Sequence, residues 1–433
     1  MAGCMVGGVQ PDRQGLDATT GDAQWRHSDD PEQFRAEVRH FLAANLPEGW
    51  RGTGGLSPRE RELANQDWRE LLNSRGLLAA AWPREFGGAD LDLAREVVLN
   101  EELSRVGLIF EDVQLHIGTD LFGQTLLAVG TDEQKKHFLP KILTGEHRWC
   151  QGFSEPGAGS DLAGLQTRAA LDGDEWVVNG QKIWTSEAHT ANWIFCLCRT
   201  DPAQKRNHGL SLLMIPMDQP GVEVRPILNI NGSVDFNEVF LTDARTSREH
   251  VVGEVNDGWR VATVLLGFER GSGALADALL YRAELDRFIE LLREQDALAD
   301  RPTRLALAEA IARVEIMRYA ALRSLSDALA GQPQGPEGSL HKLMWSEHHV
   351  ALGRLAVDVL GLQALAPTGP IPSSFFIDLP GAPNSARSWV WTWLASHSDL
   401  IRGGTSDIQR NIVAERVLGL PREPRAVTGS VTP

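Results

Sequence analysis

The sequence is poor in cysteine, and its four cysteines form no recognisable metal or disulfide pattern. Cys4, Cys150, Cys196 and Cys198 include no Cys-x-x-Cys pair, and no histidines stand at zinc-ligand spacing around them. Cys196 and Cys198 lie two apart in an apolar run, so we expect both on one face of a strand as buried, reduced thiols. The sequence therefore predicts no metal site, and its cysteine usage suits a reducing cytoplasm.

Long apolar runs are also absent. Residues 1–22 contain no signal-type apolar segment, and no stretch elsewhere is long enough to cross a bilayer. We therefore expect a cytoplasmic protein that does not enter a membrane. The 433-residue chain has a formal net charge of −16, and such an acidic chain is a poor candidate for nonspecific binding to nucleic acid.

The N-terminal third is rich in helix signals. Asp30-Pro31-Glu32-Gln33 combines an N-cap, a proline at the first helical position and a glutamine that can bond back to the cap. Thr131-Asp132-Glu133-Gln134 is a second start signal of this kind. Helical spacing of apolar residues predicts further helices over residues 59–75, 92–105 and 118–129.

The pattern changes near residue 151, where glycine and alternating β-branched and aromatic residues become frequent. Trp176–Trp184 contains Asn179-Gly180 and predicts a β-hairpin turning at that dipeptide. Further strands are predicted at residues 193–197, 210–216, 222–224 and 238–241, and the helical period returns from Trp259. The fold class is therefore α+β, with a tail (1–22), an N-terminal helical domain (23–150), a central β domain (151–255), a C-terminal helical bundle (256–420) and a second tail (421–433).

Three segments carry a resemblance to a known family. Trp149–Asp161 reads WCQGFSEPGAGSD, Asn179–Ser186 reads NGQKIWTS, and Gly403–Arg410 reads GGTSDIQR. In order and spacing they resemble the signatures of the acyl-CoA dehydrogenase family, over about residues 30 to 422. The resemblance implies a β-barrel-like central domain and a C-terminal four-helix bundle. It also implies α,β-dehydrogenation of an acyl-CoA substrate, in which a carboxylate removes the α proton and hydride passes to flavin N5.

The resemblance also implies FAD as the cofactor, reoxidised by an electron-transfer flavoprotein. Glycine at 157 and 159 allows the backbone to approach a ligand, Trp184 offers a flat face to the flavin ring, and Thr405 is expected at a helix N-terminus suited to the pyrophosphate. In isolation, Trp184 would more often be a core residue and Thr405 a simple cap. The implied cofactor-binding residues are Phe153, Ser154, Gly159, Ser160, Trp184, Ser186, Thr405 and Asp407, and the implied substrate-binding residues are Ser160, Gly403 and Gly404.

The catalytic base of the family is not found at its usual position in this sequence. Many members carry it as a glutamate directly before the Gly-Thr of the last signature, but Gly403 stands there in this chain. A minority places the carboxylate before an arginine on a helix of the bundle, which matches Glu269 and Arg270. Glu269 is therefore the candidate base and Arg270 its organiser; the competing interpretation is a solvated ion pair on a helix surface.

A second departure concerns oligomerisation. Family homotetramers complete each FAD site from a neighbour, through Arg-x-x-Phe-Gly and Gln-x-x-Gly-Gly elements. Residues 293–298 and 361–365 lack these patterns. The resemblance therefore favours a two-plus-two heterotetramer with a related subunit, of the type that oxidises bulky or steroid side-chain CoA esters. The alternatives are a non-catalytic partner subunit, or a flavin monooxygenase or oxidase on the same fold.

Overall fold

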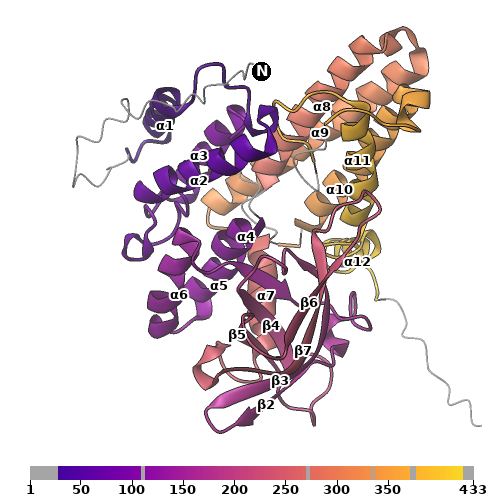
Figure 1. Cartoon of the computed structure of the whole chain (residues 1–433). Coiled ribbons are helices and arrows are strands. Elements are labelled where there is room, and N and C mark those ends of the chain that lie inside the picture. The colour runs from indigo at the N-terminus through magenta and orange to yellow at the C-terminus, as the bar shows by residue number, and fades with distance from the viewer. Residues whose placement is uncertain are drawn as a thin grey trace, which may run out of the picture.

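The computed structural model describes residues 28–108, 113–269, 274–332, 335–336, 338–370 and 377–422. Three parts follow one another along the chain, in the order helices, β-sheet, helices (Figure 1). The predicted Arg270 and the segment 371–376 lie outside the described residues. None of the helices in the described ranges is long and apolar enough to cross a membrane.

The N-terminal part is helical, and its start signals act as predicted. The Asp30 side chain accepts from Gln33 N, and Thr131 and Gln134 form a reciprocal capping box. The segment predicted as one helix over 118–129 is instead interrupted by a π-helical segment, Ile117–Gly123. The α-helices are α1 (Pro31–Asn45), α2 (Pro58–Ser74), α3 (Leu93–Arg105), α4 (Val113–His116), α5 (Gln124–Val129) and α6 (Asp132–Thr144).

The central part is an eight-stranded sheet that curves over itself. Its main order is β6-β7-β3-β2-β4-β5-β8, with β1 pairing parallel to β4. Thr246 on β7 donates to the Met214 carbonyl on β5, which joins strands from distant places in that order. The strands are β1 (Trp149–Gly152), β2 (Arg168–Asp172), β3 (Glu175–Ser186), β4 (Trp193–Arg199), β5 (Leu210–Pro216), β6 (Val222–Ile227), β7 (Phe236–Ser247) and β8 (Val251–Val252).

The predicted hairpin at Asn179-Gly180 is wrong, because both residues lie inside the long strand β3. Gly180 stands beside a register shift, and a Cβ there would lie 2.3 Å from Thr167 Oγ1. The glycine is therefore required by a close approach of two chain segments rather than by a turn. The turn between β2 and β3 falls instead at Gly173-Asp174.

The C-terminal part is a bundle in which α10 packs against α8, α9 and α11. α7 stands apart from the bundle and runs between β5 and the π-helical segment, so the sheet and the N-terminal helices meet along it (Figure 1). The helices are α7 (Gly258–Glu269), α8 (Ala274–Glu294), α9 (Arg301–Leu329), α10 (Gly338–Leu360), α11 (Ala386–Ser396) and α12 (Ser406–Ile412).

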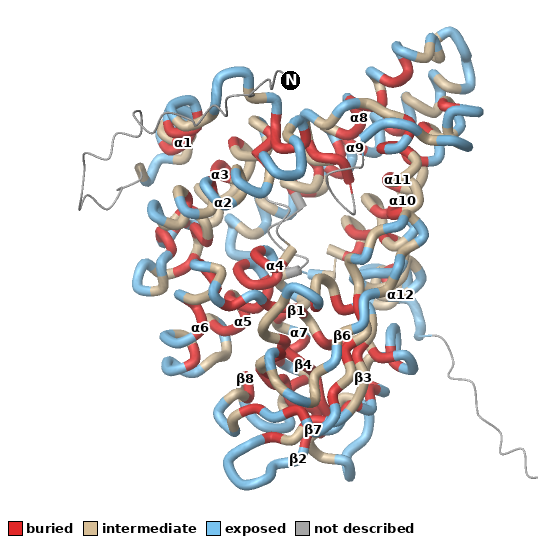
Figure 2. Tube along the Cα trace, in the orientation of Figure 1, coloured by how far each residue is buried: buried red, intermediate tan, exposed pale blue. Residues whose placement is uncertain are grey.

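One apolar core joins the N-terminal helices to the sheet (Figure 2). Phe122 of the π-helical segment stacks on Phe195 of β4 with centroids 4.8 Å apart, and Trp149 contacts both rings. Cys196 and Cys198 are fully buried on the other face of β4 as free thiols, which confirms the prediction. The shared core fixes the sheet against the helices that surround the candidate site.

Candidate active site

The first signature forms a loop that a buried lysine holds in place. Lys182 on β3 is fully buried, and its Nζ donates to Phe153 O (3.1 Å), Glu155 Oε1 (2.9 Å) and Leu197 O (2.8 Å). Glu155 also accepts from the Gln166 and Thr167 amides. Burial would raise the pKa of Glu155, but Lys182 and these donors outweigh it, so the pKa lies below its usual value. The ion pair anchors the loop to the sheet.

The exposed side of this loop carries the predicted binding groups. Gly159 and Ser160 are exposed and Ser154 is half-buried, while the Phe153 ring is buried against Phe195. Phe153 could therefore meet a cofactor only through its main chain. A Cβ added at Gly159 would meet no protein atom within 4 Å, so the surrounding protein leaves space at this position.

Trp184 is the most unusual residue of the second signature. Its side chain is 56% exposed, and its backbone has φ 60° in a register shift between Lys182 and Thr185. A bulky residue in the left-handed region is strained, and a β-bulge is a common way to redirect a side chain. The indole meets the edge of the Phe236 ring, with the two centroids 6.2 Å apart. An aromatic face is thus presented outside the core.

The first two signatures lie together. Ile183, next to Trp184, donates its amide to Ser154 O at 2.9 Å. Ser186 ends β3 and is paired with Phe236 of β7. The loop and the bulge therefore lie side by side, and Ser154 and Ser186 are both half-buried.

The third signature forms a tight turn into α12. Gly403 and Gly404 have φ of 64° and 94°, and Gln409 donates to the Gly403 carbonyl at 2.7 Å. Thr405 is the N-cap of α12 and accepts from Ile408 N, which confirms its predicted position. Asp407 is 91% exposed and pairs with Arg410. Figure 1 shows α12 below the bundle, where the chain approaches the sheet.

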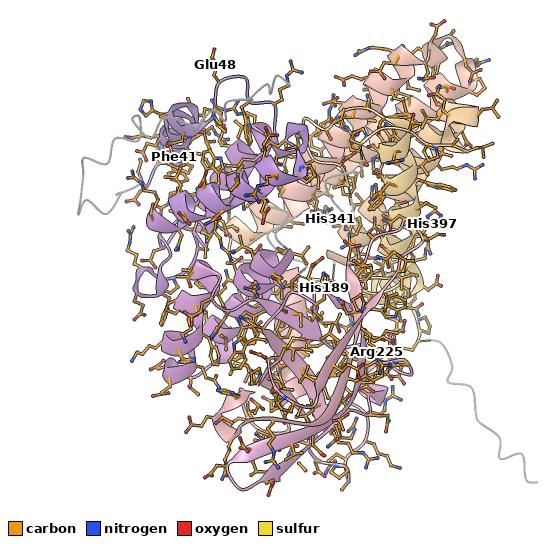
Figure 3. The ribbon with its side chains drawn as sticks, viewed as in Figure 1. Phe41, Glu48, His189, Arg225, His341 and His397 are labelled. Carbon is orange, nitrogen blue, oxygen red and sulfur yellow. The ribbon has the colours of Figure 1, made fainter. Side chains whose placement is uncertain are left out.

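Glu269 is the last residue of α7, so the candidate base stands where that helix ends. The helix packs on β5, on α5 and on the π-helical segment. In the view of Figure 3, His189 of the sheet part and His341 of α10 lie toward the middle of the molecule, in the region between sheet and bundle that this end of α7 approaches.

Comparison with known proteins decides the family. Sequence models of the N-terminal, middle and C-terminal domains of acyl-CoA dehydrogenases match residues 28–146, 150–244 and 256–418. The chain is 44% identical over 400 residues to the acyl-CoA dehydrogenase IpdE1 of Mycobacterium tuberculosis, covering 92% of this chain and 99% of that one. The chain belongs to the acyl-CoA dehydrogenase family. It is therefore an oxidoreductase that acts on CH–CH groups.

Solved structures of similar dehydrogenases agree with this fold. The Tcur3481-Tcur3483 steroid ACAD matches with a TM-score of 0.74 and 31% identity, over 92% of this chain and 99% of that one. The ChsE4-ChsE5 complex from Mycobacterium tuberculosis matches with a TM-score of 0.70 and 28% identity, over 93% and 100%. The predicted three-part architecture is confirmed.

The turn before α12 favours glycine at positions 403 and 404, which both have positive φ. At φ 64°, Gly403 occupies the left-handed region, where a side chain costs about 1 kcal/mol. A glutamate here would add strain to a turn that Gln409 fixes through its hydrogen bond, and Gly404 is also constrained, because a Cβ would lie 2.7 Å from Gln409 Nε2. The turn is built for two glycines.

Sequence reasoning missed the residues that support the site. Lys182 and Glu155 are 27 positions apart, and each looks ordinary in its motif. A second charged cluster, buried except for its arginine, is called here the α8–α10 charge cluster and consists of Glu284, Lys342, His349, Asp399 and Arg402. His349 stands between Glu284 (3.2 Å) and Asp399 (2.6 Å). The sequence hints at this cluster only through the adjacent histidines His348 and His349 in a largely apolar helical segment, and it does not show which residues would pair with them.

Proposed function

We propose that this chain is a FAD-dependent dehydrogenase subunit that oxidises the Cα–Cβ bond of an acyl-CoA, with Glu269 as the base. The observation that carries the proposal is Trp184. A large aromatic residue is held exposed, in a strained conformation, beside a signature loop that a fully buried Lys182 anchors. Strain of this kind persists where the surrounding structure enforces it, and it is concentrated at functional sites.

The described residues suit one half of a flavin site. Trp184 would cover one side of the flavin ring, with Ser186 beside it, and Ser154, Gly159 and Ser160 would supply hydroxyl and amide donors. Phe153 would contribute its main chain, and Thr405 and Asp407 lie at the start of α12. When bound, FAD would accept the hydride that leaves the β carbon.

The chain's own groups would carry the proton transfer. Glu269 would take the α proton of the thioester, and Arg270 would orient its carboxylate. Substrate binding would exclude water from Glu269 and raise its proton affinity toward the working range. Ser160, Gly403 and Gly404 would border the substrate, and the lack of a side chain at Gly403 would leave space beside the acyl group.

The relatives support a bulky substrate and a second subunit. The matching structures are a steroid ACAD named for two chains and a complex of ChsE4 with ChsE5. We infer a two-plus-two heterotetramer for this chain, with electron-transfer flavoprotein as oxidant and a bulky or steroid-derived CoA ester as substrate. A non-catalytic partner subunit is the second candidate, because Gly403 leaves the usual base position empty.

The test is a panel of acyl-CoA esters mixed anaerobically with the chain purified together with its partner. Straight-chain, branched, monocyclic and steroid side-chain thioesters would be scored by bleaching of the oxidised flavin band. We expect rapid bleaching with cyclic or steroid esters and little with short straight chains. A complex that binds FAD but is bleached by none of them would favour the non-catalytic role, and rapid reoxidation by air would favour an oxidase.

A further inference from the structure

The α8–α10 charge cluster includes Asp399 and Arg402, which directly precede the turn of Gly403 and Gly404 in the chain. Glu284, His349 and Asp399 are each at most 1% exposed, and Lys342 is 6% exposed. They come from α8, from α10 and from the 3-10 turn His397–Leu400, which ends just before Arg402. Burying two carboxylates and their cations is costly unless geometry and pairing are good, so a concentration of charge here calls for an explanation.

The backbone of this turn is held independently of the Asp399 carboxylate. Lys342 Nζ donates to the Asp399 carbonyl at 2.6 Å, and Arg402 N donates to the Ser398 carbonyl at 2.9 Å. The two oxygens of the Asp399 carboxylate bind other groups. Oδ1 accepts from Arg402 Nε at 2.8 Å, and Oδ2 meets His349 Nδ1 at 2.6 Å. The carboxylate therefore positions a side chain rather than the turn.

Two further contacts fix the guanidinium of Arg402. Its Cζ lies 4.9 Å above the Trp345 ring, and Tyr281 stacks on the same ring at 5.9 Å. His349 stays charged between its two carboxylates. Burial alone would lower its pKa, but Glu284 and Asp399 outweigh burial and raise it to about 10. Burial alone would raise the pKa of Asp399, but Arg402 and then His349 outweigh burial and lower it, so the carboxylate stays ionised beside Arg402.

Arg402 differs from the rest of the cluster because it reaches the surface of the turn. Its side chain is 39% exposed, whereas Asp399 is fully buried. It also directly precedes Gly403, the position that the proposed function sets beside the acyl group. A planar, permanently charged donor held by a carboxylate and an aromatic face is well suited to bind an oxygen atom.

We propose that Arg402 is a specificity-determining residue that binds an oxygen atom on the acyl group of the substrate, and that Asp399, His349 and Trp345 position its guanidinium for that contact. The inference rests on the proposed function and deepens it. The substrate class is a CoA ester whose ring or branch carries a ketone, hydroxyl or carboxylate. Because the guanidinium is already ordered, little side-chain freedom is lost on binding.

The test compares substrates that differ in a single oxygen-bearing group. The probes are the CoA thioesters of cyclohexanecarboxylate, its 4-oxo derivative and its 4-carboxy derivative. The chain is used with its partner and bound flavin, and kcat and KM are measured for each. Wild-type protein should have a higher kcat/KM for the 4-oxo or the 4-carboxy ester than for the unsubstituted ester. A preference for the 4-oxo ester would mean that Arg402 binds a neutral oxygen, and a preference for the 4-carboxy ester would mean that it binds an anion.

The preference is the kcat/KM of the preferred oxygen-bearing ester divided by that of the unsubstituted ester. Arg402→Met should lower this ratio by about 10- to 100-fold, since a hydrogen bond to a charged group contributes about 1.5–3 kcal/mol. The loss should fall mainly on KM. Arg402→Lys should be intermediate, because it keeps the charge without the planar fork. Arg354→Met is the matched control: Arg354 also pairs through Nε with an aspartate, Asp358, but on the exposed side of α10. The ratio should not change in this control.

An unchanged ratio in Arg402→Met, in protein with normal flavin content and melting temperature, would overturn the inference. A wild-type enzyme without preference among the three esters would overturn it as well. These outcomes are distinct from failure of the proposed function, in which none of the esters bleaches the wild-type flavin. If Arg402→Met does not assemble, Asp399→Asn provides a second test, because a released guanidinium should also lower the ratio.

Discussion

At the scale of single residues, Trp184 and Lys182 illustrate how one strand supports two opposite environments. Lys182 points inward and is fully buried, and Trp184, two positions later, is 56% exposed. In regular β-structure these two side chains would share a face. The register shift between Lys182 and Thr185 and the left-handed conformation of Trp184 break that rule. The sheet therefore holds a strained backbone in order to expose one indole ring.

Replacing Trp184 tests whether that exposure serves the flavin. Trp184→Ala should lower the flavin bound per complex, or shift the flavin absorption bands, because the ring would lose its aromatic cover. Stability should change little, since the indole is mostly outside the core. Leu171→Ala on β2, also a partly exposed apolar residue, is the control and should leave flavin content unchanged. Identical flavin content and spectrum in both variants would argue against a cofactor role for Trp184.

Glu269→Gln tests the base directly. The amide keeps the size of the side chain but cannot take the α proton, so we expect flavin bleaching by the best substrate to slow by about three orders of magnitude or more. Flavin content should stay near the wild-type value. Glu290→Gln, on an exposed face of α8, is the control and should retain its rate. If Glu269→Gln bleaches at a rate close to wild type, the proton must go to another group.

At the scale of elements, local signals predicted more than contacts between distant segments. The caps at Asp30 and Thr131 were predictable because each uses atoms within three residues. Strand β5 occurs at its predicted bounds, Leu210–Pro216. The Asn179-Gly180 turn failed because Thr167, a residue on a different segment, demands the glycine. The short strands β1, β2 and β8 were missed, since a few residues carry too little periodicity.

The same distinction applies to the site. The residues of the three signatures are contiguous in sequence and could be named from it. Their supports could not, because Lys182 meets Glu155, and His349 meets Glu284 and Asp399, only after folding. A sequence alone does not show that a charged residue is buried, because charged residues are rarely buried unless the fold supplies a partner.

The packing of α8 on α10 should depend on pH through His349. Its folded pKa of about 10 exceeds the ordinary value of 6.5. A raised pKa contributes stability that is complete below the unfolded value and is lost as pH rises through the folded value. The thermal midpoint should therefore fall between about pH 6.5 and pH 10 as this contribution disappears. His349→Gln should be less stable at neutral pH, and its midpoint should fall less steeply over that range.

The ionisable groups around His349 must be considered when the pH dependence is interpreted. Glu284 faces it from α8 and Asp399 from the turn before Arg402, while its neighbour His348 has a pKa lowered to about 3, first by burial and then by His349. His348 therefore stays neutral over the range. The exposed His397→Gln is the control and should keep the wild-type slope. Parallel slopes for wild type and His349→Gln would mean that His349 is not held charged in the fold.

At the scale of the whole molecule, the bundle leaves apolar side chains uncovered. Leu305, Ile316 and Tyr319 on α9 are each more than half exposed. Leu362 and Leu365, in and just after the 3-10 turn Gly361–Ala364, are 84% and 82% exposed. Exposed apolar residues in such number on one part of a fold indicate a surface for another protein chain. Gln363 meets Gln295 at 3.0 Å, so the two segments that lack the family's FAD elements lie together beside this surface.

That arrangement leads to a prediction about assembly. A homotetramer of this chain would offer each flavin one half-site without the complementary arginine and glycine elements, and phosphate charges without partners are costly to bury. We therefore expect the chain expressed alone to be poor in flavin and prone to aggregate. Coexpressed with a related chain that carries both elements, it should form a closed two-plus-two complex with two FAD molecules. Light scattering and flavin absorbance measure both quantities.

Charge placed on the exposed turn tests whether this surface makes the contact. Leu362→Asp with Leu365→Asp should leave the fold of the chain intact, because both side chains already face solvent, but it should prevent burial against the partner. The complex should then dissociate at micromolar concentration and lose its flavin. Leu171→Asp, at an exposed position of β2 in the sheet part, should leave assembly unchanged. A homotetramer of the unmodified chain with four bound FAD molecules and full activity would contradict the two-plus-two assembly, and it would mean that residues of its own bundle complete the flavin site.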